Sequence, residues 1–363
     1  MKKLLIWGTG NTREKFQKKY DKFFSKYYEI TAYIDKDKNK QGKGLEGKSV
    51  YAPEQIGNLE WDMILLCTIS REYQEEMLSY LEAEGIERTR IVTYLNCEGM
   101  GLIRDLIMEK YCDSKEPETK EIMDYIKEHE MSVFNMILDR SGERYKVYCD
   151  STEEDPYIWI DDKRMYYPKE FLDINTTPFL YDIYAEQSSN SPHLYIPSWK
   201  CVSKNSIIVD AGAREGNFAL KYVNESKKIY IFECEKKWCR ALSKTFSPYR
   251  HKVSIHNSFL GNSNNGNMQT LDSVISESID FLKMDIEGAE INALKGAEKV
   301  LGKSHAFCSI CAYHNSDDKI KIENILNSYG YKTSTSSGYM LYGWDDFFYE
   351  LLDLRRGVVY GQK

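Results

Sequence analysis

Short apolar runs alternate with segments of helical spacing through the first part of the chain. The apolar runs predict strands at residues 3–7, 30–34, 63–67 and 91–92. Helical spacing predicts helices over 12–27 and around Met77, Leu78 and Leu81. Because strands and helices follow one another in this order, we expect a small parallel sheet of Rossmann-like architecture.

A second alternation of strands and helices begins near residue 205. Its strands are predicted at 206–210, 229–233, 253–256, 279–284 and 306–312, and its helices at 217–224, 237–246, 289–301 and 318–328. Two shorter strands, at 145–148 and 157–160, precede it. Residues 98–145 have apolar positions at helical spacing and no strand-like run. We therefore expect an α/β protein with two Rossmann-like domains, 1–97 and 146–363, joined by a helical connector over 98–145.

A glycine-bearing turn follows the strand at 206–210, with the sequence Asp210-Ala-Gly-Ala-Arg-Glu-Gly216. Glycines allow a sharp turn and let backbone N–H groups approach a ligand. The helix that begins at Asn217 offers further unpaired N–H donors. The next strand ends in Glu233, about 20 residues on, where an acid suits two ribose hydroxyls. The pattern indicates a nucleotide-type ligand held by Gly212, Ala213, Gly216, Asn217 and Glu233.

The spacing of the turn separates a dinucleotide from a methyl donor. A dinucleotide site needs G-x-G-x-x-G to receive a pyrophosphate, whereas this turn is Asp-x-Gly-x-x-x-Gly. A carboxylate at Asp210 repels phosphate but can organise the amino-acid end of S-adenosylmethionine, directly or through water. The turn therefore favours the methyl donor over a dinucleotide, with a β-α turn that carries glycines by chance as the alternative.

Acidic residues gather again after the strand at 279–284. The segment runs Lys283-Met-Asp285-Ile-Glu287-Gly-Ala-Glu290. Asp285 is predicted to lie at the same sheet edge as Asp210, where open α/β sheets bind ligands. For Glu287 and Glu290 the alternative is an electrostatic role at the start of the following helix.

These segments together resemble the FkbM family of methyltransferases. The resemblance covers about residues 180–363 and rests on 208–216, Phe232-Glu233, Thr270-Leu-Asp272, 283–290 and Leu294-Lys-Gly-Ala297, with Glu186-Gln187, Ser191-Pro192-His193 and Tyr313-His314 as flanking segments. It implies a class I methyltransferase sheet and S-adenosylmethionine-dependent O-methylation, often of sugar or polyketide hydroxyls. Cys234 departs from the family pattern, in which proline often follows the acid.

Methyl transfer to a hydroxyl needs a base that takes the hydroxyl proton. His314 is the first candidate, because it follows a strand predicted to end at the ligand edge and histidine titrates near neutrality; its alternative is a loop-packing histidine. Asp285 is the second candidate, and could instead hold a divalent cation, although no ligand set is complete by spacing. We assign Ser258 and also Asp285 to the cofactor, and His193 and Glu287 to the substrate.

The N-terminal domain opens like a nucleotide-binding turn, with Gly8, Gly10 and Arg13 after the first strand. Arg13 replaces the third glycine, which weakens a redox dinucleotide interpretation but suits a phosphate contact. Asp35 ends the second strand, where a ribose acceptor would sit. Residues 1–95 resemble the Rossmann-like domains of nucleotide-sugar-modifying enzymes. This implies either a nucleotide-linked sugar as ligand or a docking role.

The composition restricts the kinds of partner that the protein is expected to bind. The net charge is −7, which argues against nucleic acid and anionic membranes. No apolar run reaches the ~20 residues of a membrane span. Nine scattered cysteines fit a reducing cytoplasm, and the pair Cys308 and Cys311 lacks the second pair of a zinc site.

The sequence therefore predicts a cytoplasmic enzyme that methylates a hydroxyl of a sugar or nucleotide-sugar acceptor for surface polysaccharide or glycan synthesis, and that could form a homo-oligomer. The alternatives are a non-catalytic nucleotide-binding scaffold or regulator with a degenerate methyltransferase domain, and an NAD-linked oxidoreductase in the N-terminal half.

Overall fold

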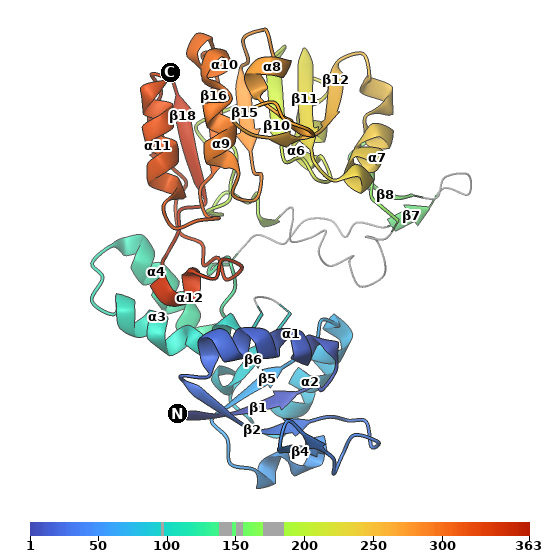
Figure 1. Cartoon of the computed structure of the whole chain (residues 1–363), viewed down its shortest axis with the longest axis vertical. Coiled ribbons are helices and arrows are strands. Elements are labelled where there is room, and N and C mark those ends of the chain that lie inside the picture. Colours follow the sequence, from blue (N-terminus) through green and yellow to red (C-terminus); the bar gives the residue numbers. More distant parts are fainter. Residues whose placement is uncertain (96–97, 138–146, 150–154, 170–184) are drawn as a thin grey trace. The chain divides into compact units, whose positions relative to one another are not determined.

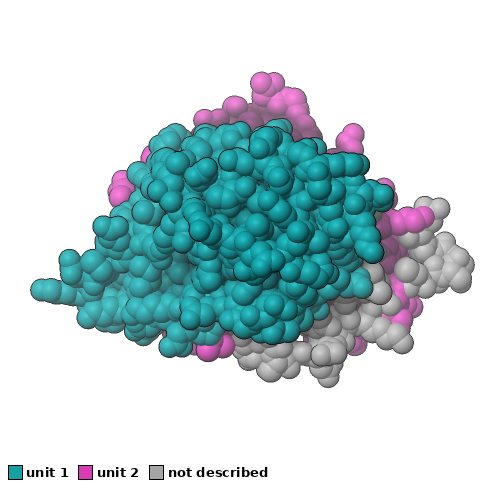
Figure 2. All heavy atoms as spheres, turned by 90° about the horizontal axis from the view of Figure 1, so that it is seen from below, with its two compact units in different colours: residues 1–136, 341–353 teal, residues 137–340, 354–363 magenta. Residues whose placement is uncertain are grey.

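A computed structural model describes residues 1–95, 98–137, 147–149, 155–169 and 185–363. The chain forms two compact units (Figure 2). Unit 1 contains Met1–Met136 and Leu341–Asp353, and unit 2 contains Ile137–Met340 and Leu354–Lys363. Each unit is built on its own parallel-dominated sheet (Figure 1), so the expected α/β class with two Rossmann-like domains is confirmed.

Unit 1 has a six-stranded sheet in the order β3-β4-β2-β1-β5-β6. Its strands are β1 (Lys2–Trp7), β2 (Tyr28–Ile34), β3 (Gly44–Leu45), β4 (Lys48–Tyr51), β5 (Met63–Leu66) and β6 (Ile91–Thr93). All neighbours are parallel except β3 and β4. The sequence did not predict β3 and β4, which are short and lie at the edge of the sheet.

Helices cover both faces of this sheet. They are α1 (Asn11–Lys19), α2 (Arg71–Ala83), α3 (Arg104–Tyr111), α4 (Pro117–Glu128) and α12 (Phe348–Leu351), with short helical turns η1 (Tyr20–Phe24), η2 (Pro53–Asn58), η3 (Arg88–Arg90) and η4 (Met100–Ile103). Met77 and Leu81 of α2 pack on strand residues such as Leu5. The helix expected over 12–27 changes pitch at Tyr20, where the Ser25 N–H donates to a carbonyl five residues back.

The helices expected to form a connector pack within unit 1. Tyr28 of β2 donates its hydroxyl hydrogen to the Leu102 carbonyl at 2.7 Å. Glu130 accepts from the Thr93 N–H at 2.7 Å and from Arg88 at 2.7 Å. The compact unit therefore extends to Met136 rather than ending at 97, because these contacts attach the helices to the sheet. The expected boundary at 145/146 lies outside the described residues.

Unit 2 has a seven-stranded sheet in the order β12-β11-β10-β15-β16-β18-β17. Its strands are β10 (Ile207–Ala211), β11 (Lys228–Glu233), β12 (Val253–Asn257), β15 (Phe281–Met284), β16 (Phe307–Cys311), β17 (Lys332–Thr335) and β18 (Val358–Gln362). The first five are parallel to one another, and β18 is antiparallel to both β16 and β17. Two smaller sheets contain β7 (Val147–Cys149), β8 (Pro156–Ile160) and β9 (Lys163–Tyr166), and β13 (Phe259–Leu260) and β14 (Met268–Gln269).

Helices lie on both faces of the large sheet (Figure 1). They are α6 (Asn217–Tyr222), α7 (Lys236–Thr245), α8 (Leu271–Val274), α9 (Glu290–Lys295), α10 (Glu298–Lys303) and α11 (Asp318–Ser328), with the turn η5 (Ser247–Tyr249). Leu294 of α9 and Ile322 of α11 join the core that includes Leu282 of β15. On the opposite face, Phe218 of α6 packs on Phe281 with ring centroids 5.3 Å apart.

The single helix expected over 289–301 is two helices. At Gly296 the backbone passes so close to the Gly261 carbonyl that a Cβ would lie 2.0 Å from its oxygen. The helix breaks at this contact. Within the described residues, no helix combines the length and apolar character needed to cross a membrane.

Candidate functional site

The turn between β10 and α6 is shaped by two glycines that touch other parts of the protein. Gly212 has a φ of 72°, and a Cβ there would lie 1.7 Å from the Asp285 carbonyl oxygen. Gly216 has a φ of 80°, and a Cβ there would lie 2.5 Å from Leu242 of α7. The glycines therefore serve close packing of the turn against its neighbours, in addition to any approach of a ligand.

Replacing Gly212 with Ala is expected to destabilise unit 2. The positive φ alone costs an L-residue about 1–2 kcal/mol, and the contact with Asp285 requires the backbone to shift as well. Urea unfolding monitored by circular dichroism should show the loss. Gly302→Ala is the matched control, because a Cβ at Gly302 of α10 meets nothing within 4 Å. Equal stability of the two variants would contradict the packing role of Gly212.

The backbone N–H groups of the turn are largely used within the protein. Those of Gly212 and Ala213 donate to the Phe232 carbonyl at 2.9 and 3.4 Å, and that of Gly216 donates to the Ala213 carbonyl at 2.7 Å. The Asn217 side chain accepts from the Phe218 N–H at 2.6 Å. The sequence interpretation, in which these N–H groups face a ligand, does not hold for Gly212, Ala213 and Gly216.

Asp210 and Lys283 form a buried ion pair under this turn. Asp210 is fully buried, with Oδ1 3.2 Å from Lys283 Nζ and Oδ2 accepting from the Ala219 N–H at 3.3 Å. Lys283 also donates to the Gly212 carbonyl at 2.6 Å. Burial opposes the charge of Lys283, but Asp210 and Asp285 raise its pKa. Asp210 therefore organises the turn from beneath, rather than presenting its carboxylate to a ligand as expected.

Glu233 joins the turns that follow β10 and β11. Its Oε2 accepts from the Arg214 N–H at 2.9 Å and its Oε1 from the Glu235 N–H at 2.8 Å. A carboxylate oxygen accepts more than one hydrogen bond, so these contacts leave capacity for two hydroxyls. On the neighbouring strand β12, Asn257 pairs with Glu233 and Ser258 follows it. The Ser258 hydroxyl is buried and has no hydrogen-bond partner within the described residues.

Asp285, which directly follows β15, is the centre of a dense polar cluster. It accepts hydrogen bonds from the hydroxyls of Tyr195 at 2.8 Å and Tyr313 at 3.2 Å. His193 Nε2 lies 3.3 Å from Oδ2, and His314 Nε2 lies 3.5 Å from Oδ1. Burial works against the charge, but the two histidines hold the pKa of Asp285 well below its usual range. Such a carboxylate is a weak base, so the geometry favours His314 over Asp285 for proton removal.

His193 lies between two carboxylates inside the cluster. Its Nδ1 is 3.5 Å from Glu186 and its Nε2 faces Asp285. Burial lowers the pKa of His193, but hydrogen bonds with Asp285 and Glu186 outweigh burial and raise it to about 9. His193 is therefore a cation at neutral pH and only 4% exposed. It is placed to hold Asp285, and a direct substrate contact remains a prediction.

His314 is oriented by carboxylates on both sides of its ring. Nδ1 lies 3.2 Å from Glu290 Oε1, whereas Nε2 faces Asp285 and, at 3.6 Å, Glu287. Burial lowers the pKa of His314, but Glu290 and then Asp285 raise it above 6.5. Arg355 fixes the backbone here by donating to the His314 carbonyl at 2.9 Å. The arrangement resembles a base held by an orienting acid.

The two acids after Asp285 have different environments. Glu290 is fully buried and accepts from the Ile286 N–H at 2.8 Å, so it is part of the support for His314. The Glu287 side chain is 80% exposed, with a φ of 55° that turns the chain at the rim of the cluster. Glu287 can therefore reach a substrate, whereas Glu290 cannot without a rearrangement.

A cation could be considered at this cluster. The ligand atoms of Asp285, Glu290 and His314 lie within 4.8 Å of one another, as do those of His193, Asp285 and Cys311. However, the His314 ring stands between Glu290 and Asp285, with a different nitrogen facing each acid. Both His314 nitrogens therefore already face acids of the protein, and a divalent cation at this cluster stays a prediction. Cys308 and Cys311 are three residues apart on β16, so they face opposite sides of the sheet.

Asp35 of the N-terminal turn has several hydrogen-bond partners within the protein. Asp35 accepts from the N–H and hydroxyl of Thr9, from the Asp37 N–H at 3.0 Å and from Lys40 at 3.0 Å. Burial raises the pKa of Asp35, but these contacts outweigh it and lower the pKa. Gly8 has a φ of 112°, and a Cβ there would lie 2.7 Å from the Cys67 carbonyl oxygen.

The other two residues assigned to this turn differ in exposure. The Arg13 side chain is 7% exposed and is paired with Glu46, which also accepts from the Tyr33 hydroxyl at 2.9 Å. At Gly10, in contrast, a Cβ would meet nothing within 4 Å. Arg13 and Asp35 already have partners inside the protein, so a nucleotide at this turn stays a prediction.

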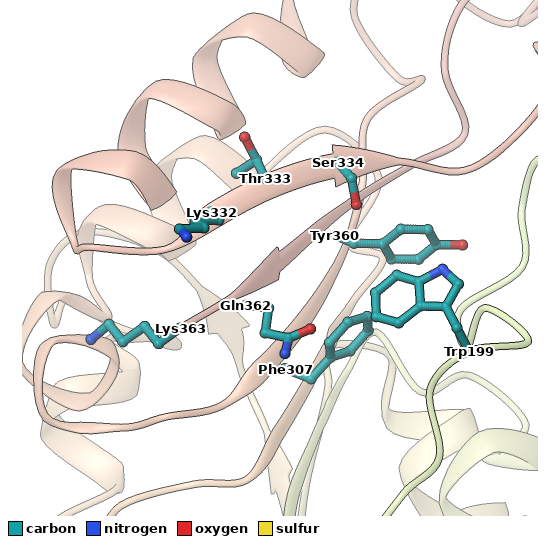
Figure 3. Close-up of a pocket in the computed structure, with 8 residues that line it drawn as sticks. All are labelled: Trp199, Phe307, Lys332, Thr333, Ser334, Tyr360, Gln362 and Lys363. Atoms are coloured by element: carbon teal, nitrogen blue, oxygen red, sulfur yellow. The ribbon is translucent and has the colours of Figure 1, made fainter.

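A hollow of about 460 Å³ opens on unit 2, away from the cluster around Asp285. Figure 3 shows the Trp199 indole beside the rings of Phe307 and Tyr360. Phe307 begins β16, whereas the Asp285 cluster lies at the carboxyl ends of the parallel strands. Ligands of open α/β sheets bind at the carboxyl ends, so the cluster, rather than this hollow, is the candidate site.

Comparison with known protein families finds one match in each of the two units. Residues 243–333 match the model described as Methyltransferase FkbM domain, and residues 1–92 match the model described as C2185-like, N-terminal. The match covers part of the C-terminal half and supports a methyltransferase domain of the FkbM type there. The likeness of the N-terminal half to nucleotide-sugar-modifying enzymes is not confirmed. No curated protein matches the sequence.

Several solved structures are similar to this chain at low identity. The Methyltransferase FkbM from Methylobacillus flagellatus KT is 15% identical, with 99% of this chain and 90% of that chain covered and a TM-score of 0.49. Precorrin-6y C5,15-methyltransferase from Geobacter metallireducens GS-15 is 14% identical, with 45% and 82% covered and a TM-score of 0.31. A SAM dependent methyltransferase from Aquifex aeolicus is 12% identical, with 45% and 85% covered and a TM-score of 0.29.

Sequence reasoning missed Tyr195 and Glu215, and it placed Glu290 at the start of the helix without linking it to His314. Tyr195 binds Asp285, Glu290 orients His314, and Glu215 places a buried carboxylate in the glycine turn. Tyr195 stands two residues after His193, which the sequence had already assigned to the site, and this proximity was a usable signal. Glu215 gave no signal, since an acid in a turn is normally exposed.

Proposed function

We propose that unit 2 transfers a methyl group from S-adenosylmethionine to a hydroxyl of a sugar or glycan precursor. The FkbM domain match supports methyl transfer. The donor set at the carboxyl edge of the sheet fits the methyl donor: Glu233 has acceptor capacity for a ribose diol, and the buried Ser258 hydroxyl has no partner within the described residues. When bound, the donor supplies an electrophilic methyl group.

The observation that carries the proposal is the orientation of His314. Glu290 engages Nδ1, which leaves Nε2 directed toward Asp285 and the exposed Glu287. A hydroxyl that replaces these contacts at Nε2 could give its proton to the ring as the methyl group passes to its oxygen; the bond from carbon to sulfur breaks, and the donor would leave as the neutral thioether. The imidazolium formed is then stabilised by the two acids that face it.

Two features support a sugar as the acceptor: an exposed acid at the rim of the Asp285 cluster, and the glycine turn of unit 1. Glu287 is exposed beside His314 and can accept hydrogen bonds from neighbouring sugar hydroxyls. Unit 1 would recruit or orient the acceptor, in keeping with the glycine turn at Gly8 and Gly10. A cytoplasmic role in surface polysaccharide or glycan synthesis belongs to the same proposal.

Mass spectrometry of a nucleotide-sugar panel tests this function. The full chain is incubated with the donor and each sugar, with Mg²⁺ in one series and EDTA in the other, and products are examined for the gain of one methyl group. The proposal expects a methylated sugar in the EDTA series too. Bound donor without turnover on any hydroxyl would instead favour the nucleotide-binding scaffold.

Glu233→Ala is expected to weaken binding of S-adenosylhomocysteine by about 100-fold or more, because hydrogen bonds to a charged group contribute about 1.5–3 kcal/mol each. Isothermal calorimetry measures the affinity. Glu298→Ala, an exposed acid on α10, controls for the change in net charge. Because Glu233 also binds two backbone N–H groups, Glu233→Gln is measured in parallel, together with the melting temperature. Unchanged affinity in a folded Ala variant would show that Glu233 does not hold the ribose.

A further inference from the structure

Glu215 is a buried carboxylate with an unused oxygen in the glycine turn. It is 7% exposed, and its Oε2 has no hydrogen-bond partner within the described residues. An ionised carboxylate is costly to bury unless a cation or several donors compensate it. A buried acid of this kind is a sign of a site that a ligand completes.

Two cations, Arg214 and Lys283, act on Glu215 and lower its pKa, but each also has another partner in the protein. Lys283 is paired with Asp210 and donates to the Gly212 carbonyl. The Arg214 guanidinium lies over the Trp238 ring, 5.6 Å from its centroid. Glu186, the remaining charged group that acts on Glu215, is negative. Burial is the largest influence, and it raises the pKa of Glu215 to about 7.

The order of strands assigns Glu215 to one end of the donor. Glu233 and Ser258 lie at the ends of β11 and β12, whereas Glu215 and Asp285 follow β10 and β15. If Glu233 holds the ribose, the amino-acid end of the donor extends toward β10 and β15. That end carries an α-ammonium group, the complement of a buried acid.

We propose that the Glu215 carboxylate binds the α-ammonium group of S-adenosylmethionine and of its product. The inference rests on the proposed function and deepens it, since it moves recognition of the amino-acid end from Asp210 to Glu215. Asp210 cannot take this part because it is fully buried and paired with Lys283.

Calorimetry with two ligands isolates the ammonium contact. S-adenosylhomocysteine carries the α-ammonium group, whereas 5′-methylthioadenosine lacks the whole amino-acid end. Glu215→Gln should weaken S-adenosylhomocysteine by about 10- to 100-fold and leave 5′-methylthioadenosine unchanged. Glu225→Gln removes the same charge from an exposed position at the other end of β10 and should alter neither affinity.

The number of protons released on ligand binding gives a second test. A purely structural role of Glu215 would not change this number. At pH 7 a carboxyl with a pKa of about 7 is half ionised, and a bound cation ionises it fully. Titrations in buffers of different ionisation enthalpy should therefore show release of about half a proton in the parent and none from this group in Glu215→Gln.

The titrations distinguish failure of the ammonium contact from failure of the proposed function. Equal weakening of both ligands, or proton uptake in place of release, would overturn the ammonium contact while leaving the proposed function intact. Uptake would mean that the protonated acid donates to the ligand carboxylate. If the parent protein binds neither ligand, the proposed function fails first, and the inference fails with it.

Discussion

Replacing His314 with Gln is expected to lower kcat by about 10²- to 10⁴-fold, the usual contribution of a positioned general base. The glutamine amide can still donate to Glu290, which otherwise faces the His314 Nδ1 atom, but it cannot accept a proton from the acceptor hydroxyl. Affinity for S-adenosylhomocysteine should stay within about twofold of the parent, because no donor contact is assigned to His314. Steady-state kinetics on the acceptor found in the panel measures the loss.

The pH profile distinguishes a base from a packing residue. A base works when neutral, and the pKa of His314 is raised above 6.5 chiefly by Glu290, against the effect of burial. Activity of the parent should therefore rise with pH through a limb above 6.5, and the residual activity of His314→Gln should lack that limb. His251→Asn, in an exposed turn, is the control. A loss of kcat below tenfold would remove His314 from the proton transfer.

Replacing Lys283 with Met should be among the most destabilising single changes in unit 2. It leaves Asp210 fully buried without its cation, and breaking a buried pair in this way costs about 3–5 kcal/mol. Urea unfolding at pH 7 measures the loss. The control is Lys299→Met, which removes a positive charge from the exposed side of α10.

A second variant tests the cause of that loss. The double variant Asp210→Asn, Lys283→Met removes both charges, so it should recover a substantial part of the stability. If the double variant is no more stable than Lys283→Met, the lost stability does not come from an unpaired Asp210.

Much of the fold of unit 2 could be predicted because its core strands are continuous apolar runs that end in polar residues. The expected strand at 229–233 corresponds to β11, and the helix at 318–328 to α11. Strand β17 was missed since Lys332–Thr335 is a polar edge strand whose pairing with β18 joins distant parts of the chain. Local pattern cannot reveal such a pairing.

In the candidate site, too, features that depend on neighbouring residues in the sequence could be predicted, whereas features that depend on distant residues could not. The turn, Asp285 and His314 were found from their positions after strands. The roles of Gly212 and Asp210 could not be found, because each depends on residues more than 70 positions away: the Asp285 carbonyl for Gly212, and Lys283 for Asp210. Both partners come from β15 and the loop that follows it, which only the folded sheet brings next to β10.

Neither unit of this protein is a continuous stretch of sequence. Residues Leu341–Asp353 return to unit 1, where the Tyr349 ring stacks on Phe23 at 4.6 Å, and the chain then goes back to supply β18 between β16 and β17. A cut near residue 136 would thus deprive the first unit of its returning segment. Excising that segment would separate the last strand from the sheet it completes, so neither unit can be produced as a single uninterrupted fragment of the chain.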